Sequence, residues 1–214
     1  LAGIRVPQQL GSASTYARAR LGGLDGRLLT PAAQLLATAG SNGEKRLRTP
    51  PVDAKAAIRV VLGPQDDYFD AGSIARLLSE PYRVLAAADR MGMRLDTVPV
   101  NDNLPSRLDG PLLRHRPEKG SEIISDATVP GSIQVPGQGQ PIVLLADGQT
   151  AGGYPKIATV ISADLPRLAV MAPGQIVRFA AMSGVAAEQA ARARAATLRA
   201  LIADIGPLAE AGTL

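Results

Sequence analysis

Six short apolar runs, each bounded by turn-forming residues, constrain the fold of this chain more than any other feature. They are Ile58 to Leu62, Tyr82 to Ala86, Ile133 to Val135, Ile142 to Ala146, Ile157 to Ile161 and Ile176 to Phe179. Apolar runs of this length between Gly, Pro, Asn and Asp residues are typical of strands. Their number and spacing predict a mainly β fold, a barrel or sandwich, with a few helices added.

Three segments are predicted to be helical. Asp70 can cap a short helix over residues 71 to 79, which Pro81 ends, and residues 164 to 169 form a second candidate. From Ser183 onward the chain is rich in Ala, Glu, Gln, Arg and Leu, with one apolar face of helical period. We therefore expect a barrel domain over residues 1–182. A C-terminal helix and tail over residues 183–214 would dock on the barrel or on a partner.

Composition narrows the possible functions. The chain is 46% apolar and 20% charged, which indicates a globular protein. Aromatic residues make up 3% and tryptophan is absent, which argues against stacking on single-stranded nucleic acid. The net charge of +4 is spread along the chain rather than gathered in a stripe, so small anions are better partners than nucleic acid.

The chain has no cysteine and one histidine. A thiolate nucleophile, a disulfide framework and a Cys/His zinc site are therefore excluded, and no metal site is expected. No stretch approaches the roughly 18 apolar residues of a membrane span, so we expect a cytoplasmic protein that contacts no membrane. The chain begins at Leu1 without Met, inside what reads as a strand, which suggests a fragment of a larger polypeptide.

The segment from Gly131 to Lys156 is the best candidate for a site, because it places a buried strand between stretches rich in Gly, Pro and amide side chains. Asp147 follows that strand, and partial burial would raise its pKa towards a range useful for acid/base chemistry. The alternative is a carboxylate that accepts hydrogen bonds from turn amides. Gly152 and Gly153 permit positive φ and the close approach of a ligand or another backbone.

Cationic and amide side chains flank this segment. Arg90 and Arg94 lie four residues apart around a glycine, which suits a grip on a carboxylate or phosphate, although either could pair with Asp89 instead. Lys156 could complement an anion or be a solvated lysine at a strand end. Glutamine side chains can donate to and accept from an amide substrate, or they can simply line turns. The residues expected to bind substrate are Arg90, Arg94, Gln134, Gln140, Gln149, Thr150, Gly152, Gly153 and Tyr154, and those expected to be catalytic are Asp147 and Lys156.

Four segments together resemble the allophanate hydrolase subunit 2 family: Gly11 to Thr15, Gly22 to Arg27, Asp89 to Leu95, and Gly131 to Ala169. The most specific parts are the string Asp-Arg-Met-Gly-x-Arg-Leu and the run that ends in Gln-Thr-x-Gly-Gly-Tyr-Pro. The resemblance implies a cyclophilin-like β-barrel, preceded in the family by a further N-terminal region. The chain departs from the family pattern at Gly148 and Ala151, both inside the candidate site.

The resemblance also implies a function. It indicates a subunit of an ATP-dependent hydrolase, 5-oxoprolinase, that opens the lactam of 5-oxoproline to glutamate. Such a subunit works with a sister subunit of the allophanate hydrolase subunit 1 type and a third hydrolase subunit, and ATP is shared with these partners. The chain has no phosphate-binding loop of the Walker type, and Met91-Gly-Met93 lacks the lysine of a biotin attachment site. Two alternatives stay open: the carboxyltransferase part of a biotin-dependent urea carboxylase, and a regulator that binds a kinase-inhibiting sister protein.

Overall fold

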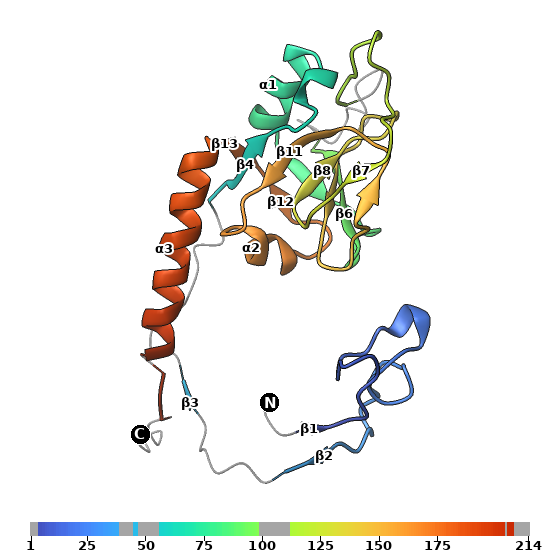
Figure 1. Cartoon of the computed structure of the whole chain (residues 1–214), viewed down its shortest axis with the longest axis vertical. Helices are drawn as coiled ribbons and strands as arrows, with labels where there is room; N and C mark the ends of the chain where they lie inside the picture. The colour runs from blue at the N-terminus through green and yellow to red at the C-terminus, as the bar shows by residue number, and fades with distance from the viewer. Residues whose placement is uncertain (1–3, 39–44, 47–55, 99–111, 204, 208–214) are drawn as a thin grey trace. The chain divides into compact units, whose positions relative to one another are not determined.

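The computed structural model describes residues 4–38, 45–46, 56–98, 112–203 and 205–207 (Figure 1). The chain divides into two compact units, one formed by residues 1–48 and 204–214 and the other by residues 49–203. All of the candidate site residues lie in the second unit.

An eight-stranded sheet builds the second unit. In spatial order its strands are β12 (Ile176–Val177), β5 (Tyr82–Val84), β6 (Gly92–Thr97), β9 (Ile142–Leu144), β8 (Ser132–Gln134), β11 (Lys156–Val160), β4 (Ile58–Leu62) and β13 (Phe179–Ala181). Neighbouring strands are antiparallel except β13 and β4, which are parallel. The sheet curves into a nearly closed barrel (Figure 1). Each of the six apolar runs contributes to a strand of this sheet, so the predicted mainly β barrel is confirmed.

The register of the central strands separates two rows of side chains. Met93, Val143, Ile133 and Ala158 are paired in turn across β6, β9, β8 and β11, and all four are buried in the core. The next row, on the opposite face, is Arg94, Ile142, Gln134 and Lys156. A register shift between Lys156 and Ala158 allows the lysine to join this second row.

The barrel core is aliphatic, as the composition requires. It contains Val60, Leu77, Leu95, Ile133 and Ile157 among others, and the rings of Tyr82 and Phe179 meet within it, with centroids 5.7 Å apart. In the first unit, the only buried residues among those described are Gly22, Gly23 and Gly26. The apolar core of the described chain therefore lies in the second unit.

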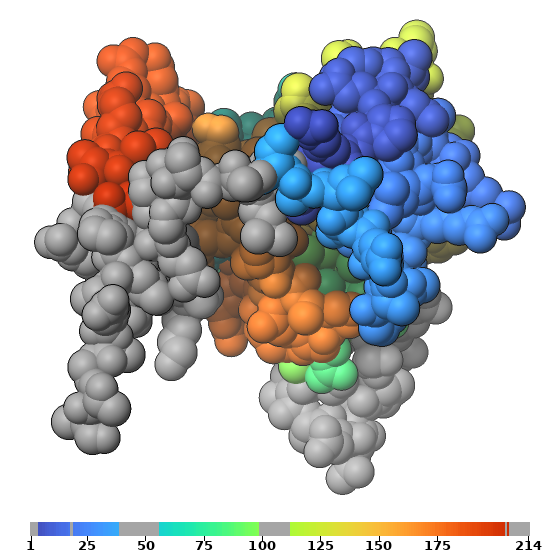
Figure 2. Space-filling model, turned by 90° about the horizontal axis from the view of Figure 1, so that it is seen from below, coloured from blue at the N-terminus to red at the C-terminus, as the bar shows by residue number. Residues whose placement is uncertain are grey.

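Two short helices confirm the sequence prediction. α1 (Ala71–Ser79) begins after Asp70, whose carboxylate accepts a hydrogen bond of 2.6 Å from the backbone N–H of Ser73. α2 (Leu165–Ala169) begins after Asp164 and lies at the surface, where it is orange in Figure 2. Short 3-10 helices span Ala17–Ala19 and Asp66–Tyr68.

The C-terminal helix α3 spans Gly184–Ala203, as expected, and has no buried residue. On its predicted apolar face Ala187 and Ala191 are half-buried, whereas Leu198 and Ile202 are 42% and 67% exposed. The face is therefore covered only near its start in the described structure. No helix in the described part of the chain has the length and apolar character needed to cross a membrane.

Three two-stranded ribbons complete the fold. β7 (Asp126–Ala127) pairs with β10 (Ala151–Gly152) in the second unit. β1 (Ile4–Arg5) pairs with β2 (Leu36–Ala37), and β3 (Lys45–Arg46) pairs with β14 (Gly206–Pro207), both in the first unit. The β7–β10 ribbon matters most for the site, because its residues contact the Gln134 and Lys156 side chains.

Candidate functional site

Arg90 and Asp147 form a two-bond ion pair between neighbouring turns. The Arg90 Nε donates to Asp147 Oδ2 at 2.7 Å and Nη2 donates to Oδ1 at 2.9 Å. The backbone N–H of Asp147 also donates to the carbonyl of Arg90 at 2.9 Å. The pairing of β6 with β9 brings the two turns together, since Gly92 stands opposite Leu144. Two expected site residues are thus in direct contact.

The Arg90 guanidinium lowers the pKa of Asp147. Its hydrogen bonds hold the pKa of the Asp147 carboxyl below the usual range and outweigh the opposing effect of burial. The expectation that burial would raise this pKa is therefore wrong, and Asp147 is an ionised carboxylate at neutral pH. The alternative was a pair of Asp89 with Arg90 or Arg94. Arg90 pairs with Asp147, while the Asp89 carboxylate accepts from the backbone N–H groups of Met91 and Gly92.

A second cluster joins the buried Gln134 of β8 to the exposed Gln149, which follows β9, beside the β7–β10 ribbon. Gln149 Nε2 donates to Gln134 Oε1 at 2.9 Å, and Gln134 Nε2 lies 3.5 Å from the carbonyl of Tyr154. Gln134 is 2% exposed. A Cβ at Gly152 would lie 2.5 Å from Gln134 Nε2, so glycine at this position allows the ribbon to approach the sheet closely. The close approach expected at this glycine pair is present, and it is made by a side chain of the same protein.

Lys156 belongs to the same cluster and is 2% exposed. Its Nζ donates to Asp126 Oδ2 at 2.7 Å and to the carbonyl of Ala127 at 3.0 Å. Gln65 also donates to the Asp126 carboxylate, at 3.1 Å, and together with Lys156 it keeps the pKa of that carboxyl low. The lysine is therefore neither solvated nor open to an external anion in this conformation.

The remaining predicted residues surround these two clusters. Arg94 is exposed on β6, in the same register row as Gln134, and Gln140 is half-buried just before β9. The carbonyl of Thr150 accepts from the backbone N–H of Thr128 at 3.0 Å, and that of Gly153 accepts from Ile123 at 2.8 Å. Tyr154 is exposed. The predicted site is thus two hydrogen-bonded clusters, one around Arg90 and one around Lys156.

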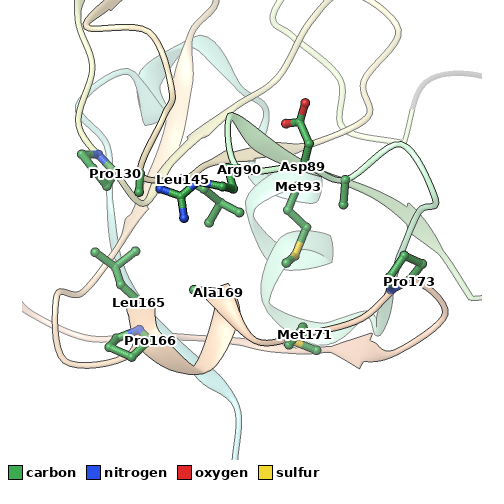
Figure 3. A pocket seen from close by; sticks show the side chains of 12 residues that line it. Asp89, Arg90, Met93, Pro130, Leu145, Leu165, Pro166, Ala169, Met171 and Pro173 are labelled. Carbon is green, nitrogen blue, oxygen red and sulfur yellow. The ribbon is translucent and has the colours of Figure 1, made fainter. Parts of the chain in front are cut away.

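A cavity of about 490 Å³ opens beside the first cluster (Figure 3). Its lining residues are Ala88, Asp89, Arg90, Met93, Pro130, Leu145, Ala146, Leu165, Pro166, Ala169, Met171 and Pro173. Of the predicted site residues only Arg90 lines it. Sequence reasoning missed the others because single apolar residues of a turn and a short helix carry no signal that they share a wall.

Asp126 and Gln65, which hold Lys156, were also missed, since no motif marks them. In the portions of the chain that the structure describes, no group of three or more His, Cys, Asp or Glu side chains could hold a metal ion.

The fold and the sequence together place the chain among carboxyltransferase-type domains. Residues 1–181 match the family described as carboxyltransferase domain, subdomain A and B, and the chain belongs to that family. The chain is 35% identical over 195 residues to one subunit of the 5-oxoprolinase of Escherichia coli (strain K12), in an alignment that covers 90% of this chain and 56% of that protein. The resemblance derived from the sequence motifs is confirmed.

Two further comparisons concern larger proteins. The urea amidolyase of Lachancea kluyveri is 26% identical over 216 residues, covering 93% of this chain and 11% of that protein. The crystal structure of Kluyveromyces lactis urea carboxylase superposes with a TM-score of 0.70 at 22% identity, over 99% of this chain and 20% of that one. This likeness supports the fold. The chain spans about half the length of the 5-oxoprolinase subunit that it matches.

Proposed function

We propose that this chain is part of a subunit of an ATP-dependent hydrolase that opens the lactam of 5-oxoproline to glutamate. The observation that carries the proposal is the 35% identity with the E. coli 5-oxoprolinase subunit over 90% of the chain. A lactam is a poor electrophile. Phosphorylation of its oxygen by ATP would release ADP and make the ring carbon electrophilic enough for water to add. The ring C–N bond would then break as its nitrogen takes up a proton, and hydrolysis of the resulting acyl phosphate would give glutamate and phosphate. The reaction therefore needs cations, amide partners and a group that takes a proton from water and can pass it to the ring nitrogen.

The Arg90 cluster supplies two of these requirements. The guanidinium lies at the cavity, where it can bind an anion. Asp147 is ionised and can accept a proton from an attacking water, although its lowered pKa makes it a weaker base than an unpaired aspartate. Arg94, exposed on β6, is a further cation for a phosphate or a carboxylate.

The Lys156 cluster supplies the amide partners. In the present conformation Gln134 and Gln149 bond to each other, and Lys156 bonds to Asp126. Contact of these groups with a substrate therefore requires the β7–β10 ribbon to separate from the sheet. We assign Gln134, Gln149 and Lys156 to a state in which the ribbon has opened.

The proposal includes partner subunits in the cytoplasm: a sister subunit of the allophanate hydrolase subunit 1 type, and a third hydrolase subunit with which ATP is shared. The E. coli relative is itself named as a subunit, which supports this part of the proposal.

A second candidate is the carboxyltransferase step of a urea amidolyase. The 26% identity with the Lachancea kluyveri enzyme over 93% of the chain favours it. In that case the site would receive a carboxylated biotin arm from another domain. The higher identity with the 5-oxoprolinase subunit places this candidate second.

Complementation separates the two candidates. This chain should replace the matching 195-residue segment of the E. coli 5-oxoprolinase subunit and restore growth on 5-oxoproline as the nitrogen source. In the purified complex, glutamate and ADP should form together. Asp147→Asn and Lys156→Ala should each lower turnover by about 10²-fold.

Lys119→Ala is the matched control, because it breaks the exposed Lys119–Asp67 pair of 2.7 Å, which lies outside both clusters. It should leave turnover unchanged. A folded chimera that forms no glutamate, or one that carboxylates urea instead, would contradict the first proposal.

A further inference from the structure

The cavity beside α2 has the composition of a site for a small molecule with an apolar body. Its volume of about 490 Å³ lies in the range of small-molecule pockets. Ten of its twelve lining residues are Ala, Leu, Met or Pro. Figure 3 shows Met93 and Leu145 on one side and Leu165, Pro166, Ala169 and Met171 on the other. Such walls favour hydrocarbon over water.

The two charged lining residues do not contribute equally. The Asp89 carboxylate accepts hydrogen bonds of 2.8 and 3.1 Å from the backbone N–H groups of Met91 and Gly92, and it points away from the cavity in Figure 3. The Arg90 side chain is 76% exposed and lines the cavity. Arg90 is therefore the cation at the cavity, and it keeps its ion pair with Asp147.

Asp147 accepts hydrogen bonds from only some of the N–H groups of Arg90. A guanidinium has five N–H donors, and the ion pair uses Nε–H and one N–H of Nη2. Within the described residues, Nη1 has no hydrogen-bond partner. The edge formed by Nη1 and Nη2 is thus available, and its geometry matches the two oxygens of a carboxylate.

We propose that this cavity binds a small carboxylate with an apolar ring or chain. The apolar body lies between Met93 and α2, and the carboxylate accepts two hydrogen bonds from the free edge of Arg90. A ring that bears a carboxylate, as 5-oxoproline does, belongs to this class; in that respect the inference rests on the proposed function and assigns the substrate carboxylate to Arg90.

Calorimetric titration of the full chain with three probes, and then with 5-oxoproline, tests the proposal. Cyclopentanecarboxylate has both features, cyclopentanecarboxamide lacks the charge, and acetate lacks the ring. Cyclopentanecarboxylate should bind about 10-fold or more tightly than either of the other two, because only it uses both the guanidinium and the apolar walls.

Two variants assign the binding to the cavity. Arg90→Met should reduce the affinity for cyclopentanecarboxylate to that for the carboxamide, leaving the latter unchanged. Ala169→Phe, at an exposed position of α2 that lines the cavity, should weaken both ligands. Arg192→Met is the control, because Arg192 is an exposed arginine paired with Glu188 on α3.

Equal affinity for cyclopentanecarboxylate and its carboxamide would overturn the proposal, as would binding that both cavity variants leave intact. A folded chain that binds cyclopentanecarboxylate at no concentration up to about 10 mM would also overturn it. Binding of cyclopentanecarboxylate without binding of 5-oxoproline would support the cavity as a carboxylate site and remove it from lactam opening. Failure of this binding proposal can therefore be distinguished from failure of the proposed function, which is measured by turnover in the complex.

Discussion

Replacing Arg59 with methionine should destabilise the protein at pH 7 more than replacing its partner Asp164 with alanine. Asp164 is 2% exposed and accepts three hydrogen bonds from Arg59: from the backbone N–H at 2.8 Å, from Nε at 2.9 Å and from Nη2 at 2.7 Å. The Arg59 side chain is 40% exposed. Removing the arginine therefore leaves a buried anion, whereas removing the aspartate leaves a cation that water can reach.

The size of each effect follows from this asymmetry. Asp164→Ala removes the charge-assisted hydrogen bonds of Arg59 and the 3.7 Å pair with the largely buried Arg167. The Arg167 guanidinium keeps the carbonyls of Ala56 and Ala57 as acceptors, so we expect a cost of about 2–3 kcal/mol. Arg59→Met leaves the Asp164 carboxylate with one backbone donor and the longer 3.7 Å pair with Arg167, and breaking a buried pair in this way costs about 3–5 kcal/mol. Asp164 can escape this cost by binding a proton. With an unfolded-state pKa of about 3.9, protonating it costs about 4 kcal/mol at pH 7 and about 1.5 kcal/mol at pH 5, and these values are the upper limits of the effect.

Between pH 7 and pH 5, the stability difference between wild type and Arg59→Met should change because Asp164 takes up a proton in the variant. In the native protein, burial tends to raise the pKa of Asp164, but the hydrogen bonds and charge of Arg59 outweigh burial and lower it. When folding lowers the pKa of a carboxyl, its contribution to stability is complete above the unfolded-state pKa and is lost as pH falls through the folded-state pKa. The wild type therefore keeps the full contribution of Asp164 between pH 7 and pH 5. In Arg59→Met the folded-state pKa of Asp164 should be raised. As pH falls from 7 to 5, the stability of this variant should therefore rise relative to that of the wild type.

Urea denaturation followed by far-ultraviolet circular dichroism measures both effects, since the chain has no tryptophan. The free energy of unfolding should be determined for wild type, Arg59→Met and Asp164→Ala at pH 7 and pH 5. Arg192→Met, in an exposed pair on α3, is the control and should change stability by less than about 0.5 kcal/mol. An Arg59→Met cost that is equal at the two pH values, or below the Asp164→Ala cost at pH 7, would refute the reasoning.

Two further predictions concern the β7–β10 ribbon. Asp126→Ala should lower the urea midpoint more than Lys156→Met, although Asp126 is 48% exposed and Lys156 is only 2% exposed. The reason is that only Asp126→Ala leaves a buried ammonium group without its anion. A larger effect of Lys156→Met would show that the ammonium group reaches water. Gly152→Ala should lower the free energy of unfolding by about 1–3 kcal/mol, since the new Cβ would lie 2.5 Å from Gln134 Nε2. It should also speed amide exchange at Thr128, whose N–H donates to the carbonyl of Thr150 beside β10. Gly153→Ala is the neighbouring control, with 3.5 Å to its nearest atom, and an equal effect there would contradict the packing argument.

The parts of the fold that depend on local sequence were predictable. Apolar runs such as Ile142 to Ala146 and Ile157 to Ile161 overlap strands β9 and β11, because a strand buried on one or both faces selects such residues wherever it pairs. Asp70 caps α1 as predicted, because an N-cap contact spans only three residues. These features need no knowledge of which strand lies beside which.

The partners of the charged residues were not predictable. The sequence shows that Asp147 follows a buried strand, but its partner Arg90 is 57 residues away and is brought there by the pairing of β6 with β9. The pKa direction followed from that unseen partner. Asp164 was expected only at the start of a helix, and its contact with Arg59 spans 105 residues.

The register shift in β11 shows why a site of this kind depends on more than residue types. Regular alternation would place Lys156 on the same face as Ala158 and Val160, inside the apolar core, where an ammonium without an anion is strongly disfavoured. The shift instead puts Lys156 opposite Gln134, on the face that the ribbon carrying Asp126 covers. The irregularity in β11 and the acidic residue of the ribbon therefore depend on each other, since without the ribbon carboxylate this face too would hold a buried lysine with no counter-charge.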